Sequence, residues 1–362
     1  MEGLVVNPSF WKNKRVFLTG HTGFKGAWAA AWLVQMGAKV TGYSRAPEAE
    51  PNLWTLLDLQ EVDSVIGDLN DRATLECALR KAQPQVILHM AAQALVLRSY
   101  RDPVETFTSN VIGSVNLLDA ARICPDLQAI VVATSDKAYA NVEQIWGYRE
   151  SDPMGGHDPY SASKGACEIA TQSMAKSFYA PHANGGHPAR VATVRAGNVI
   201  GGGDWSDDRL VPDIVRGCLG PSQSVALRAP GSIRPWQHVL EPIRGYLMVA
   251  ERLVAGDDAA ASGWNFGPDR IDERAVIEVA QAIVTALGKG RVLIEESNSN
   301  PHEAKLLRLD CARARAELGW VPALQFDDCV QFTAQWYADW AAGRPAAEIC
   351  REQIAAYEGK VL

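Results

Sequence analysis

The stretch Thr19-Gly20-His21-Thr22-Gly23-Phe24-Lys25-Gly26 decides the fold of this chain. A β-rich run at residues 15–19 precedes it, and a helical pattern at residues 24–36 follows it. In a G-x-x-G-x-x-G turn, the first glycine makes the turn, the second admits a pyrophosphate and the third allows close helix packing. The helix N-terminus then faces the phosphates. We therefore expect a dinucleotide site here, the alternative being a glycine-rich turn without a ligand. Its candidate residues are Gly20, His21, Thr22, Gly23, Phe24, Lys25 and Gly26.

Short apolar strands alternate with helical patterns beyond this turn. Strands are predicted at residues 39–43, 64–67, 85–89, 129–133 and 190–194, and helices at 72–81, 104–123 and 160–179. This alternation is typical of an α/β protein with a doubly wound parallel sheet, the Rossmann architecture. After Arg195 the pattern changes to loops and short helices, which indicates a smaller mixed C-terminal substrate lobe. We expect a dinucleotide-binding domain at 1–195, with a returning segment near 236–256, and a mainly substrate-binding lobe at 196–362.

The composition excludes several classes of partner. The chain has 362 residues and a formal net charge of −7, so no basic surface that would neutralise nucleic-acid phosphates is indicated. Neither a run of about 20 apolar residues nor a signal peptide is found, so we expect no membrane partner. The seven cysteines form no C-x-x-C pair. This argues against a bound metal and fits reduced thiols in a cytoplasmic protein.

Three further strand ends carry candidates for cofactor binding. The second strand ends in Ser44-Arg45, where NAD-binding folds usually place an acid on the ribose hydroxyls. Arg45 could pair with the 2′-phosphate of NADP, or it could be a solvated side chain stacked on adenine. Asp68-Leu69 after the third strand suits the adenine edge, although Asp68 could instead cap a helix. Small residues after the fourth strand let the backbone line the cofactor, and they are Met90, Ala91 and Ala92.

Five residues on the next two elements carry candidate chemistry. Tyr160-x-x-x-Lys164 places a phenol and an amine on one helix face, where the ammonium favours the phenolate. A phenolate can take a proton from a sugar hydroxyl while a nicotinamide takes the hydride. Ser135-Asp136-Lys137 adds a hydroxyl, an acid and an amine, which an enzyme that only oxidised an alcohol would not need. These residues suggest an elimination coupled to the redox step, unless Asp136 and Lys137 form a surface ion pair.

The chain resembles the extended short-chain dehydrogenase/reductases over nearly its whole length. More narrowly, it resembles the CDP-glucose 4,6-dehydratases in four segments that occur in order, at residues 20–26, 134–137, 195–205 and 234–239. The dTDP-glucose dehydratases have Thr-Asp-Glu where this chain has Ser135-Asp136-Lys137. The lysine therefore supports CDP-glucose as the substrate.

The resemblance implies that CDP-D-glucose becomes CDP-4-dehydro-6-deoxy-D-glucose and water, in deoxysugar biosynthesis for the lipopolysaccharide O-antigen. Tyr160 would take the 4-hydroxyl proton as hydride leaves C4 for NAD⁺, water would leave across C5–C6, and the hydride would return to C6. Ser135 can hydrogen-bond O4, and a protonated Asp136 can donate to the departing 6-hydroxyl. Lys164 can also bind the nicotinamide ribose. Lys137 is either a neutral base for C5 or a cation that stabilises the enolate.

Candidates for substrate recognition come from the second half of the chain. The resemblance favours NAD, with NADP open, and it implies a homodimer or homotetramer formed through the Tyr160 helix. The alternatives are a nucleotide-sugar 4-epimerase, a dehydratase of another NDP-hexose, and a non-catalytic NADP-sensing regulator. The pair Asp136-Lys137 disfavours the epimerase, and the presence of both Tyr160 and Lys164 disfavours the regulator. Arginine suits a pyrophosphate through its planar donors. The candidate substrate-binding residues are Asn198, Arg209, Arg234, His238 and Tyr246.

Overall fold

The computed structural model describes residues 6–179, 186–227, 229–294 and 306–361. None of the helices in these ranges combines the length and the apolar character that crossing a membrane requires. In the same ranges, no three His, Cys, Asp or Glu side chains form a group that could hold a metal ion. All seven cysteines are free, and Cys77 alone among them is exposed.

Helices and strands alternate along the described chain. The α-helices are α1 (Pro8–Trp11), α2 (Phe24–Gln35), α3 (Leu53–Leu57), α4 (Arg72–Ala82), α5 (Val96–Arg101), α6 (Pro103–Phe107), α7 (Gly113–Ala120), α8 (Pro159–Phe178), α9 (Leu210–Leu219), α10 (Leu240–Val254), α11 (Val276–Leu287), α12 (Phe326–Ala341) and α13 (Ala346–Val361). The strands are β1 (Arg15–Thr19), β2 (Lys39–Ser44), β3 (Asp63–Ile66), β4 (Val86–His89), β5 (Ala129–Ala133), β6 (Arg190–Ala196), β7 (Asn198–Ile200), β8 (Ser224–Leu227), β9 (Ile233–His238), β10 (Gly263–Phe266), β11 (Glu273–Ala275) and β12 (Arg291–Ile294). Shorter helical turns are η1 (Thr108–Ile112), η2 (Ala121–Ile123), η3 (Asp136–Ala138), η4 (Asp258–Ala260), η5 (Arg270–Asp272) and η6 (Ala314–Leu318).

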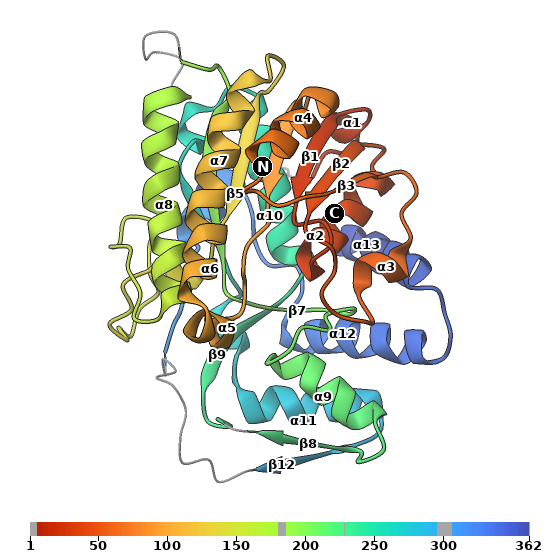
Figure 1. The fold of residues 1–362 in the computed structure, drawn as a ribbon. Coiled ribbons are helices and arrows are strands. Elements are labelled where there is room, and N and C mark those ends of the chain that lie inside the picture. Colours follow the sequence, from red (N-terminus) through yellow and green to blue (C-terminus); the bar gives the residue numbers. More distant parts are fainter. Residues whose placement is uncertain (1–5, 180–185, 228, 295–305, 362) are drawn as a thin grey trace.

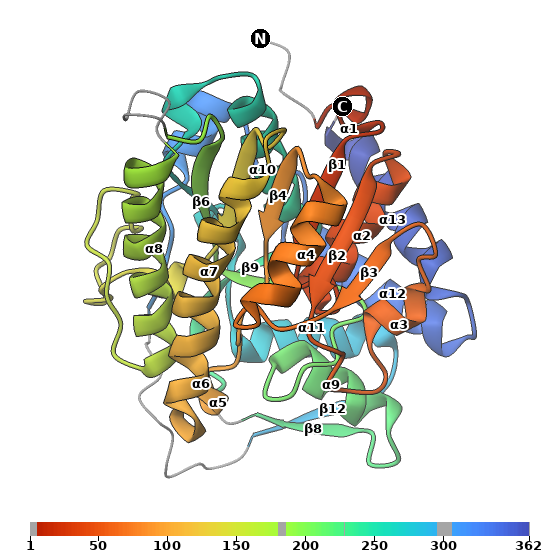
Figure 2. The ribbon, with the colours of Figure 1, turned by 45° about the horizontal axis from the view of Figure 1, so that its top comes forward.

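A parallel sheet forms the centre of the larger lobe, with the strand order β3-β2-β1-β4-β5-β6-β10 (Figures 1 and 2). The order 3-2-1-4-5-6 is that of the doubly wound nucleotide-binding fold. Ligands of such sheets bind outside the carboxyl ends of the strands, where the strand order reverses. The predicted Rossmann sheet is confirmed, and its reversal point between β1 and β4 lies beside the glycine turn.

Both faces of this sheet are covered, because successive residues of a strand point to opposite sides. Phe17 packs with residues of α4, α7 and α8 in one core, whereas Val16 and Leu18 pack with residues of α2 and α10 in the other. Figure 2 shows α4, α7 and α8 in front of the strands on one face of the sheet. With both faces buried, the carboxyl edge is the part of the sheet that can receive a ligand.

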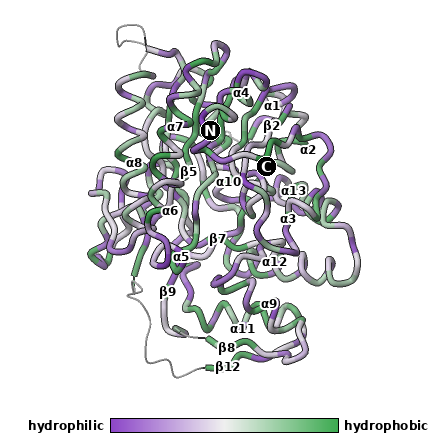
Figure 3. The backbone as a smooth tube through the Cα atoms, viewed as in Figure 1, coloured by the Kyte–Doolittle hydropathy of each residue, from purple (hydrophilic) through white to green (hydrophobic). Residues whose placement is uncertain are grey.

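The smaller lobe lies below the carboxyl edge of the main sheet (Figure 1). It contains the sheet β11-β9-β7, the pair β12-β8, and the helices α9 and α11. Figure 3 shows that β8 and α11 are largely apolar. Val225 and Leu227 of β8 and Val279 and Ile283 of α11 are buried in the apolar core that continues into the larger lobe, so apolar packing holds the smaller lobe in place.

The helical segment predicted at residues 104–123 is interrupted by the π-helical turn η1. Asn110 in this turn accepts a hydrogen bond from Gln93 N at 2.8 Å and donates to Gln93 O at 3.0 Å. It also donates to Ser163 Oγ of α8 at 2.9 Å. Turns of this kind are rare and often occur at functional sites. Here the turn ties the segment after β4 to the helix that carries Tyr160.

Segments after residue 196 also belong to the larger lobe, and there are more of them than the one segment expected near 236–256. That segment contains α10, which packs against β5 and β6. In addition, β10 pairs with β6, and α13 packs against α2 and α3. The domain boundary expected between residues 195 and 196 therefore assigns β10 and α13 to the wrong lobe. A strand of four residues shows too little alternation to be recognised as part of a distant sheet.

Candidate active site

A cleft of about 910 Å³ runs between the carboxyl edge of the main sheet and the smaller lobe. Ligand pockets in proteins commonly have volumes of this order. Its walls include the turns after β1, β2, β3, β4, β5 and β6, together with residues of β7, α9 and β9. All four sequence segments that carry the family resemblance contribute residues to it.

The glycine turn fits a bound dinucleotide. Gly20 has a φ of +78°, and a Cβ there would lie 2.7 Å from the backbone nitrogen of Ala91. A Cβ on Gly26 would lie 2.0 Å from the carbonyl oxygen of Gly20, so α2 can pack on this turn only with glycine at that position. No side chain caps the N-terminus of α2 at Gly23. Its first N–H groups are therefore available to an anion in the cleft.

His21 is the residue of this turn whose side chain points away from the cleft. Its Nε2 lies 2.8 Å from Ser64 Oγ, and burial lowers the pKa of the imidazole to about 4. His89 at the end of β4 is also buried, with Thr19 Oγ1 at 2.7 Å and Ser114 Oγ at 2.9 Å. Both imidazoles are neutral packing groups near pH 7, and the part of His21 that can face a cofactor is its backbone.

Asp68 lines the cleft and does not cap α4. Asp71 performs that role, because its Oδ1 accepts a hydrogen bond from Thr74 N at 3.2 Å. The carbonyl oxygen of Asp68 accepts a hydrogen bond from the Tyr43 hydroxyl at 2.9 Å, which fixes the turn after β3. The other cofactor candidates that line the cleft are Gly20, Thr22, Gly23, Phe24, Lys25, Gly26, Ser44, Arg45, Leu69, Met90, Ala91 and Ala92.

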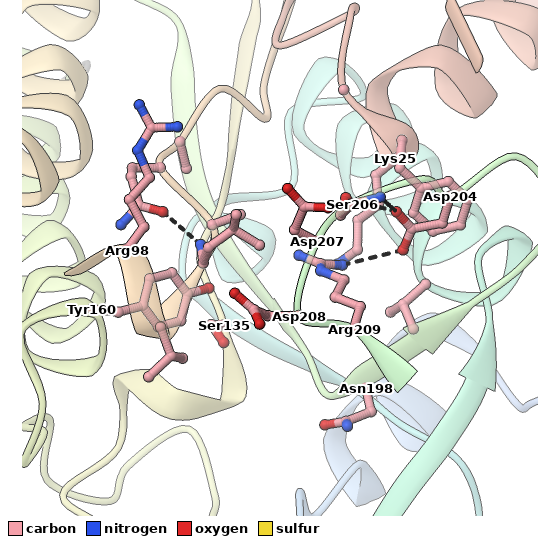
Figure 4. Close-up of a pocket in the computed structure, with 18 of the residues that line it drawn as sticks. Lys25, Arg98, Ser135, Tyr160, Asn198, Asp204, Ser206, Asp207, Asp208 and Arg209 are labelled. Carbon is pink, nitrogen blue, oxygen red and sulfur yellow. Dashed lines mark hydrogen bonds and ion pairs between the residues drawn. The ribbon is translucent and has the colours of Figure 1, made fainter. Parts of the chain in front are cut away.

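Ser135, Asp136 and Tyr160 come together on one wall of the cleft, and Figure 4 shows the Ser135 hydroxyl beside the Tyr160 phenol. Ser135 donates a hydrogen bond to Asp136 Oδ1 at 2.9 Å. Asp136 is 4% exposed, and burial raises the pKa of its carboxyl group. Gly197 borders this carboxyl group, since a Cβ at Gly197 would be in van der Waals contact with Asp136 Oδ2 at 3.4 Å. The wall therefore offers a phenol, a hydroxyl and a carboxylic acid whose pKa burial raises.

Two lysines flank these groups. Burial lowers the pKa of Lys164, whose Nζ donates to Ala133 O at 3.5 Å. Burial raises the pKa of the Tyr160 phenol, while a hydrogen bond with Ser135 and the charge of Arg209 lower it. Arg209 of the smaller lobe thus favours the phenolate of Tyr160, a role that the sequence predicted for Lys164. Lys137 is half-buried in the cleft wall, and its charge opposes the rise in the pKa of Asp136.

Lys25 reaches further into the site than its place in the glycine turn suggests. Figure 4 shows its side chain beside Asp204, close to Arg209 of the smaller lobe. The pKa of Lys25 is lowered from 10.5 to about 8, chiefly by burial; Arg209 contributes to the decrease, and Asp136 and Asp204 oppose it. Its amine therefore lies in the field of groups from both lobes. The sequence could not indicate this, because a motif does not give the direction of a side chain.

Three of the predicted substrate-binding residues line the cleft on the side of the smaller lobe. They are Asn198 at the start of β7, Arg209 before α9, and Arg234 of β9. The nearest atoms of Arg209 and the buried Asp204 are 3.6 Å apart, and Figure 4 shows this pair. Arg234 donates to Ile233 O at 2.8 Å through Nη1. Two guanidinium groups on this wall can meet a pyrophosphate.

His238 and Tyr246 do not line the cleft, so the sequence-based placement of both near the nucleotide is not supported. His238 is fully buried between the rings of Trp28 and Phe332, with centroids at 6.0 and 5.5 Å, and burial lowers its pKa to about 3. Tyr246 packs against Phe266 in the main core. His238 is the last residue of β9, a strand that leads from the cleft into the core. The sequence motif alone does not show which residues of this strand face the cleft and which pack in the core.

A buried ion pair behind the site was not recognised in the sequence. Arg195 donates to both carboxylate oxygens of Glu168, at 2.7 and 2.8 Å, and both side chains are fully buried. Arg195 also donates to the Tyr139 hydroxyl at 2.6 Å, and the Thr134 hydroxyl donates to Glu168. Glu168 lies one turn after Lys164 on α8. The network thus holds α8 against β5 and β6. The position of Glu168, four residues after Lys164 on the same helix face, is the sequence signal that could have indicated a role for Glu168.

The family model described as GDP-mannose 4,6 dehydratase matches residues 17–333. This span contains the glycine turn, the wall with Ser135 and Tyr160, and the arginines of the smaller lobe. The chain belongs to the GDP-mannose 4,6 dehydratase family. Members of this 4,6-dehydratase family are therefore the proteins with which its site is compared.

Two curated proteins are similar to this chain along most of its length. The CDP-glucose 4,6-dehydratase of Salmonella typhimurium is 43% identical over 354 residues, which are 98% of this chain and 98% of that protein. The dTDP-glucose 4,6-dehydratase of Xanthomonas campestris pv. campestris is 26% identical over 343 residues, which are 88% of this chain and 92% of that protein. The similarity therefore extends over both lobes.

Solved structures share the fold of this 4,6-dehydratase family member. An epimerase of Methanothermobacter thermautotrophicus has a TM-score of 0.79 at 20% identity, covering 95% of this chain and 96% of the other. A dTDP-glucose 4,6-dehydratase of Bacillus anthracis in complex with NAD has a TM-score of 0.72 at 21% identity, covering 90% of this chain and 96% of the other. One fold thus serves epimerases and dehydratases, and residues of the site must distinguish them.

Proposed function

We propose that this protein is a CDP-glucose 4,6-dehydratase, a lyase that converts CDP-D-glucose to CDP-4-dehydro-6-deoxy-D-glucose and water. The observation that carries the proposal is the buried carboxyl group of Asp136, which shares the hydroxyl of Ser135 with the phenol of Tyr160. Oxidation at C4 needs the phenol, and loss of the 6-hydroxyl needs an acid. The 43% identity to a CDP-glucose 4,6-dehydratase supports the choice of substrate.

The residues of the cleft fit NAD as the cofactor. The glycine turn and the N-terminus of α2 would hold its pyrophosphate, and Asp68 and Ser44, which line the cleft, would contact its adenosine half. Lys164, at the other end of the cleft, would bind the nicotinamide ribose. When bound, the nicotinamide accepts the hydride from C4 and returns it to C6.

Tyr160 and Ser135 serve the oxidation at C4. The Tyr160 phenolate would take the proton of the 4-hydroxyl, and Ser135 would hydrogen-bond O4. Burial raises the pKa of the phenol, so nearby donors and cations are needed to favour the phenolate. Ser135 and Arg209 act in this direction, and a charged Lys164 would add to it. The resulting 4-ketone makes the proton on C5 acidic.

Asp136 and Lys137 serve the elimination. Burial favours the protonated form of Asp136, which can donate its proton to the departing 6-hydroxyl. Lys137 would take the C5 proton as a neutral base and return a proton to C5 when the hydride reaches C6, or it would stabilise the enolate as a cation while another base moves that proton. After the reaction, Tyr160 has gained the O4 proton and Asp136 has lost one to water. A transfer through the Ser135 hydroxyl, which lies between them, restores both groups.

The main rival is a nucleotide-sugar 4-epimerase, since the fold serves both activities. An epimerase needs no acid for a leaving hydroxyl, whereas here a buried acid is hydrogen-bonded to Ser135. A dehydratase acting on another NDP-hexose keeps the same chemistry and differs in the base it binds. A non-catalytic NADP sensor would not require Tyr160, Lys164 and Asp136 in one wall of the cleft.

The test is to incubate the protein with NAD⁺ and CDP-glucose, and to follow the 4-keto sugar by its absorbance in alkali and by mass spectrometry. We expect a product lighter than the substrate by one water. UDP-glucose, dTDP-glucose and GDP-mannose are the comparison substrates, and Tyr160→Phe is the inactive control. Formation of CDP-galactose without a ketone would establish the epimerase instead. Faster turnover of another nucleotide sugar would change the substrate but keep the reaction.

We further propose that the protein is a cytoplasmic homo-oligomer, in which α8 and the neighbouring α6 and η1 form the subunit interface. These elements pack together along one side of the larger lobe (Figure 1). Large apolar side chains are exposed on them, with Val104 at 73%, Ile112 at 52% and Ile169 at 61%. Association with a second copy would bury this surface. A dimer needs one such contact, and a tetramer would need a second.

A further inference from the structure

Four charged residues from three segments form a closed ring of ion pairs at one end of the cleft. Arg45 and Glu48 follow β2, Arg98 belongs to α5, and Glu105 belongs to α6. Arg45 contacts Glu48 at 2.8 Å and Glu105 at 3.0 Å. Arg98 contacts the same two carboxylates at 2.5 and 2.7 Å. Each arginine thus meets both glutamates, and each glutamate meets both arginines.

The Arg98–Glu105 pair anchors this ring. Arg98 donates from Nε at 2.8 Å and from Nη2 at 2.7 Å to the two oxygens of Glu105, which is the strong parallel geometry for this pair. The hydrogen bond from Arg98 holds the pKa of Glu105 below its usual range. Glu105 therefore remains charged near neutral pH. The formal charges of the four residues sum to zero, so the arginines have no unpaired charge to offer.

The ring lies at the adenosine end of the cofactor site. All four residues line the same cleft as the glycine turn. Thr22 of that turn lies 2.8 Å from Ser44 Oγ and donates to Arg45 O at 2.9 Å, so the glycine turn and the start of the ring are fixed to each other. In Rossmann folds, the end of the second strand faces the 2′-position of the adenosine ribose. Arg45 thus lies where an arginine would receive the 2′-phosphate of NADP.

We propose that Glu48 and Glu105 select NAD over NADP by occupying Arg45 and Arg98. A 2′-phosphate would bring about two negative charges to a place that already holds two carboxylates. It would bind Arg45 only by displacing one of them or by accepting their repulsion. NAD carries no charge at this position and leaves the ring intact. The proposal rests on the proposed use of NAD, and it assigns the selection to residues that no motif contains.

The experiment measures binding of NAD⁺ and NADP⁺ to the full-length protein by isothermal titration calorimetry, without substrate. The variants are Glu48→Gln, Glu105→Gln and the double variant, and the control is Asp119→Asn, which removes the partner of Arg72 at a surface pair outside the cleft. We expect NADP⁺ to bind about tenfold or more tightly in the double variant, because two repulsive charges are lost. NAD⁺ affinity should change by less than about threefold, since no charge on NAD meets the ring. Adding Arg45→Ala to the double variant should cancel the gain for NADP⁺.

An unchanged ratio of NADP⁺ to NAD⁺ affinity in the double variant, with the fold intact by circular dichroism, would overturn the proposal. If the double variant fails to fold, Glu48→Gln decides, because Glu48 is exposed and should by itself give a measurable gain for NADP⁺. CDP-glucose turnover with NAD⁺ is assayed separately. A wild-type protein that binds NADP⁺ more tightly would overturn both this inference and the proposed cofactor. An unchanged ratio together with normal turnover would overturn this inference alone.

Discussion

At the scale of single residues, the surroundings of Asp136 and Lys25 in the cleft shift the pKa values of both side chains. Burial favours the neutral form of both Asp136 and Lys25. Each also lowers the cost of charging the other, because their opposite charges attract. An acid and a base that are both ready to change state are typical of sites that move protons. The chemistry therefore depends on a few individual side chains, which substitutions can test.

Tyr160→Phe should lower turnover by about 10²–10⁴-fold, because it removes the proposed general base but keeps the ring. The measurement is initial-rate formation of the 4-keto sugar from CDP-glucose. Tyr179→Phe is the matched control, since Tyr179 is buried in the core at the end of α8 and does not line the cleft. It should keep turnover within a few-fold of wild type. Wild-type rates in Tyr160→Phe would remove the phenol from the mechanism.

Asp136→Asn should separate oxidation from elimination. It keeps the shape of the side chain but cannot give up a proton, so the sugar should be oxidised at C4 and retain its 6-hydroxyl. Single-turnover experiments would read this as reduced-cofactor absorbance together with a 4-keto-6-hydroxy sugar. The expected loss in product formation is about 10²-fold or more. Failure of Asp136→Asn to oxidise a sugar that it still binds would instead assign Asp136 to the first step.

Lys137→Ala tests the identity of the C5 base. If Lys137 is that base, the variant should oxidise C4 but lose solvent deuterium exchange at C5, because no other group takes that proton. Mass spectrometry of substrate recovered from D₂O provides the measurement. Exchange that persists at the wild-type rate would leave Lys137 with the role of a cation beside the enolate.

At the element scale, α8 is the element that organises the site. Its N-terminus is capped by Asp158, whose Oδ1 accepts a hydrogen bond from Ser161 N at 2.9 Å. Tyr160, Lys164 and Glu168 follow at intervals of four residues, so they lie along one face of the helix. The first two line the cleft, and the third is held by Arg195. The position of the reactive groups thus depends on the buried pair behind them.

Removing one partner of this pair should destabilise the protein strongly. Arg195→Met should lower the free energy of unfolding by about 3–5 kcal/mol, because it leaves the Glu168 carboxylate buried without its partner. Glu168→Leu combined with Arg195→Met should cost less than the sum of the two single changes, since neither charge is then left alone. Urea unfolding followed by circular dichroism gives the values. Additive costs would mean that the two side chains contribute independently.

The contact between α1 and α10 should depend on pH. Glu251 of α10 accepts hydrogen bonds from Asn7 N at 2.9 Å and from Trp11 Nε1 at 2.7 Å. Burial raises the pKa of its carboxyl from 4.5 to about 7. The folded state thus holds this proton more tightly than the unfolded chain does. The resulting stabilisation is complete below pH 4.5 and is lost as the pH rises through about 7.

Glu251→Gln should remove this dependence, because the amide stays neutral and keeps an acceptor. Thermal unfolding at a series of pH values from 5 to 8 is the measurement. The midpoint of the wild type should fall relative to that of the variant as the pH passes 7, by about 2 °C. Parallel curves for the two proteins would show that the carboxyl group titrates normally.

At the scale of the whole molecule, the proposed subunit interface provides a test. Ile169→Asp combined with Val104→Asp places charges on the exposed apolar surface of α8 and α6. The expected result in sedimentation velocity is a shift from oligomer to monomer, because a charge buried in an interface without a partner is unfavourable. Ile271→Asp is the control, since Ile271 is equally exposed but lies in η5 of the smaller lobe. A wild type that sediments as a monomer would refute the interface.

The fold could be predicted from the sequence because its signals are local. The strands β1, β4 and β5 are mainly apolar, a helix follows each strand of the first half, and the glycine turn indicates which strand comes first at the site. The order of the strands then follows from the fold class. The returns of β10 and α13 could not be predicted, since they depend on packing between segments distant in the sequence.

The candidate site could be predicted where neighbouring residues share a function, as in Ser135 and Asp136. It could not be predicted where charges from separate segments meet. Glu48, Arg98 and Glu105 belong to no motif, and their ring forms only because the turn after β2 lies against α5 and α6. His238 shows the opposite failure, since it lies in a family segment but its imidazole is surrounded by core rings.

The place of β10 in the sheet has a consequence for how the chain is made. A ribosome releases β6 first, then β7, α9, β8, β9 and α10, and only afterwards the four residues of β10 that pair with β6. At a translation rate of about 5–20 residues per second, the outer edge of β6 stays unpaired for several seconds before β10 is synthesised. An uncovered parallel strand can pair with other chains. The nascent protein therefore passes through a stage prone to aggregation, and nascent-chain chaperones should improve its yield most during that interval.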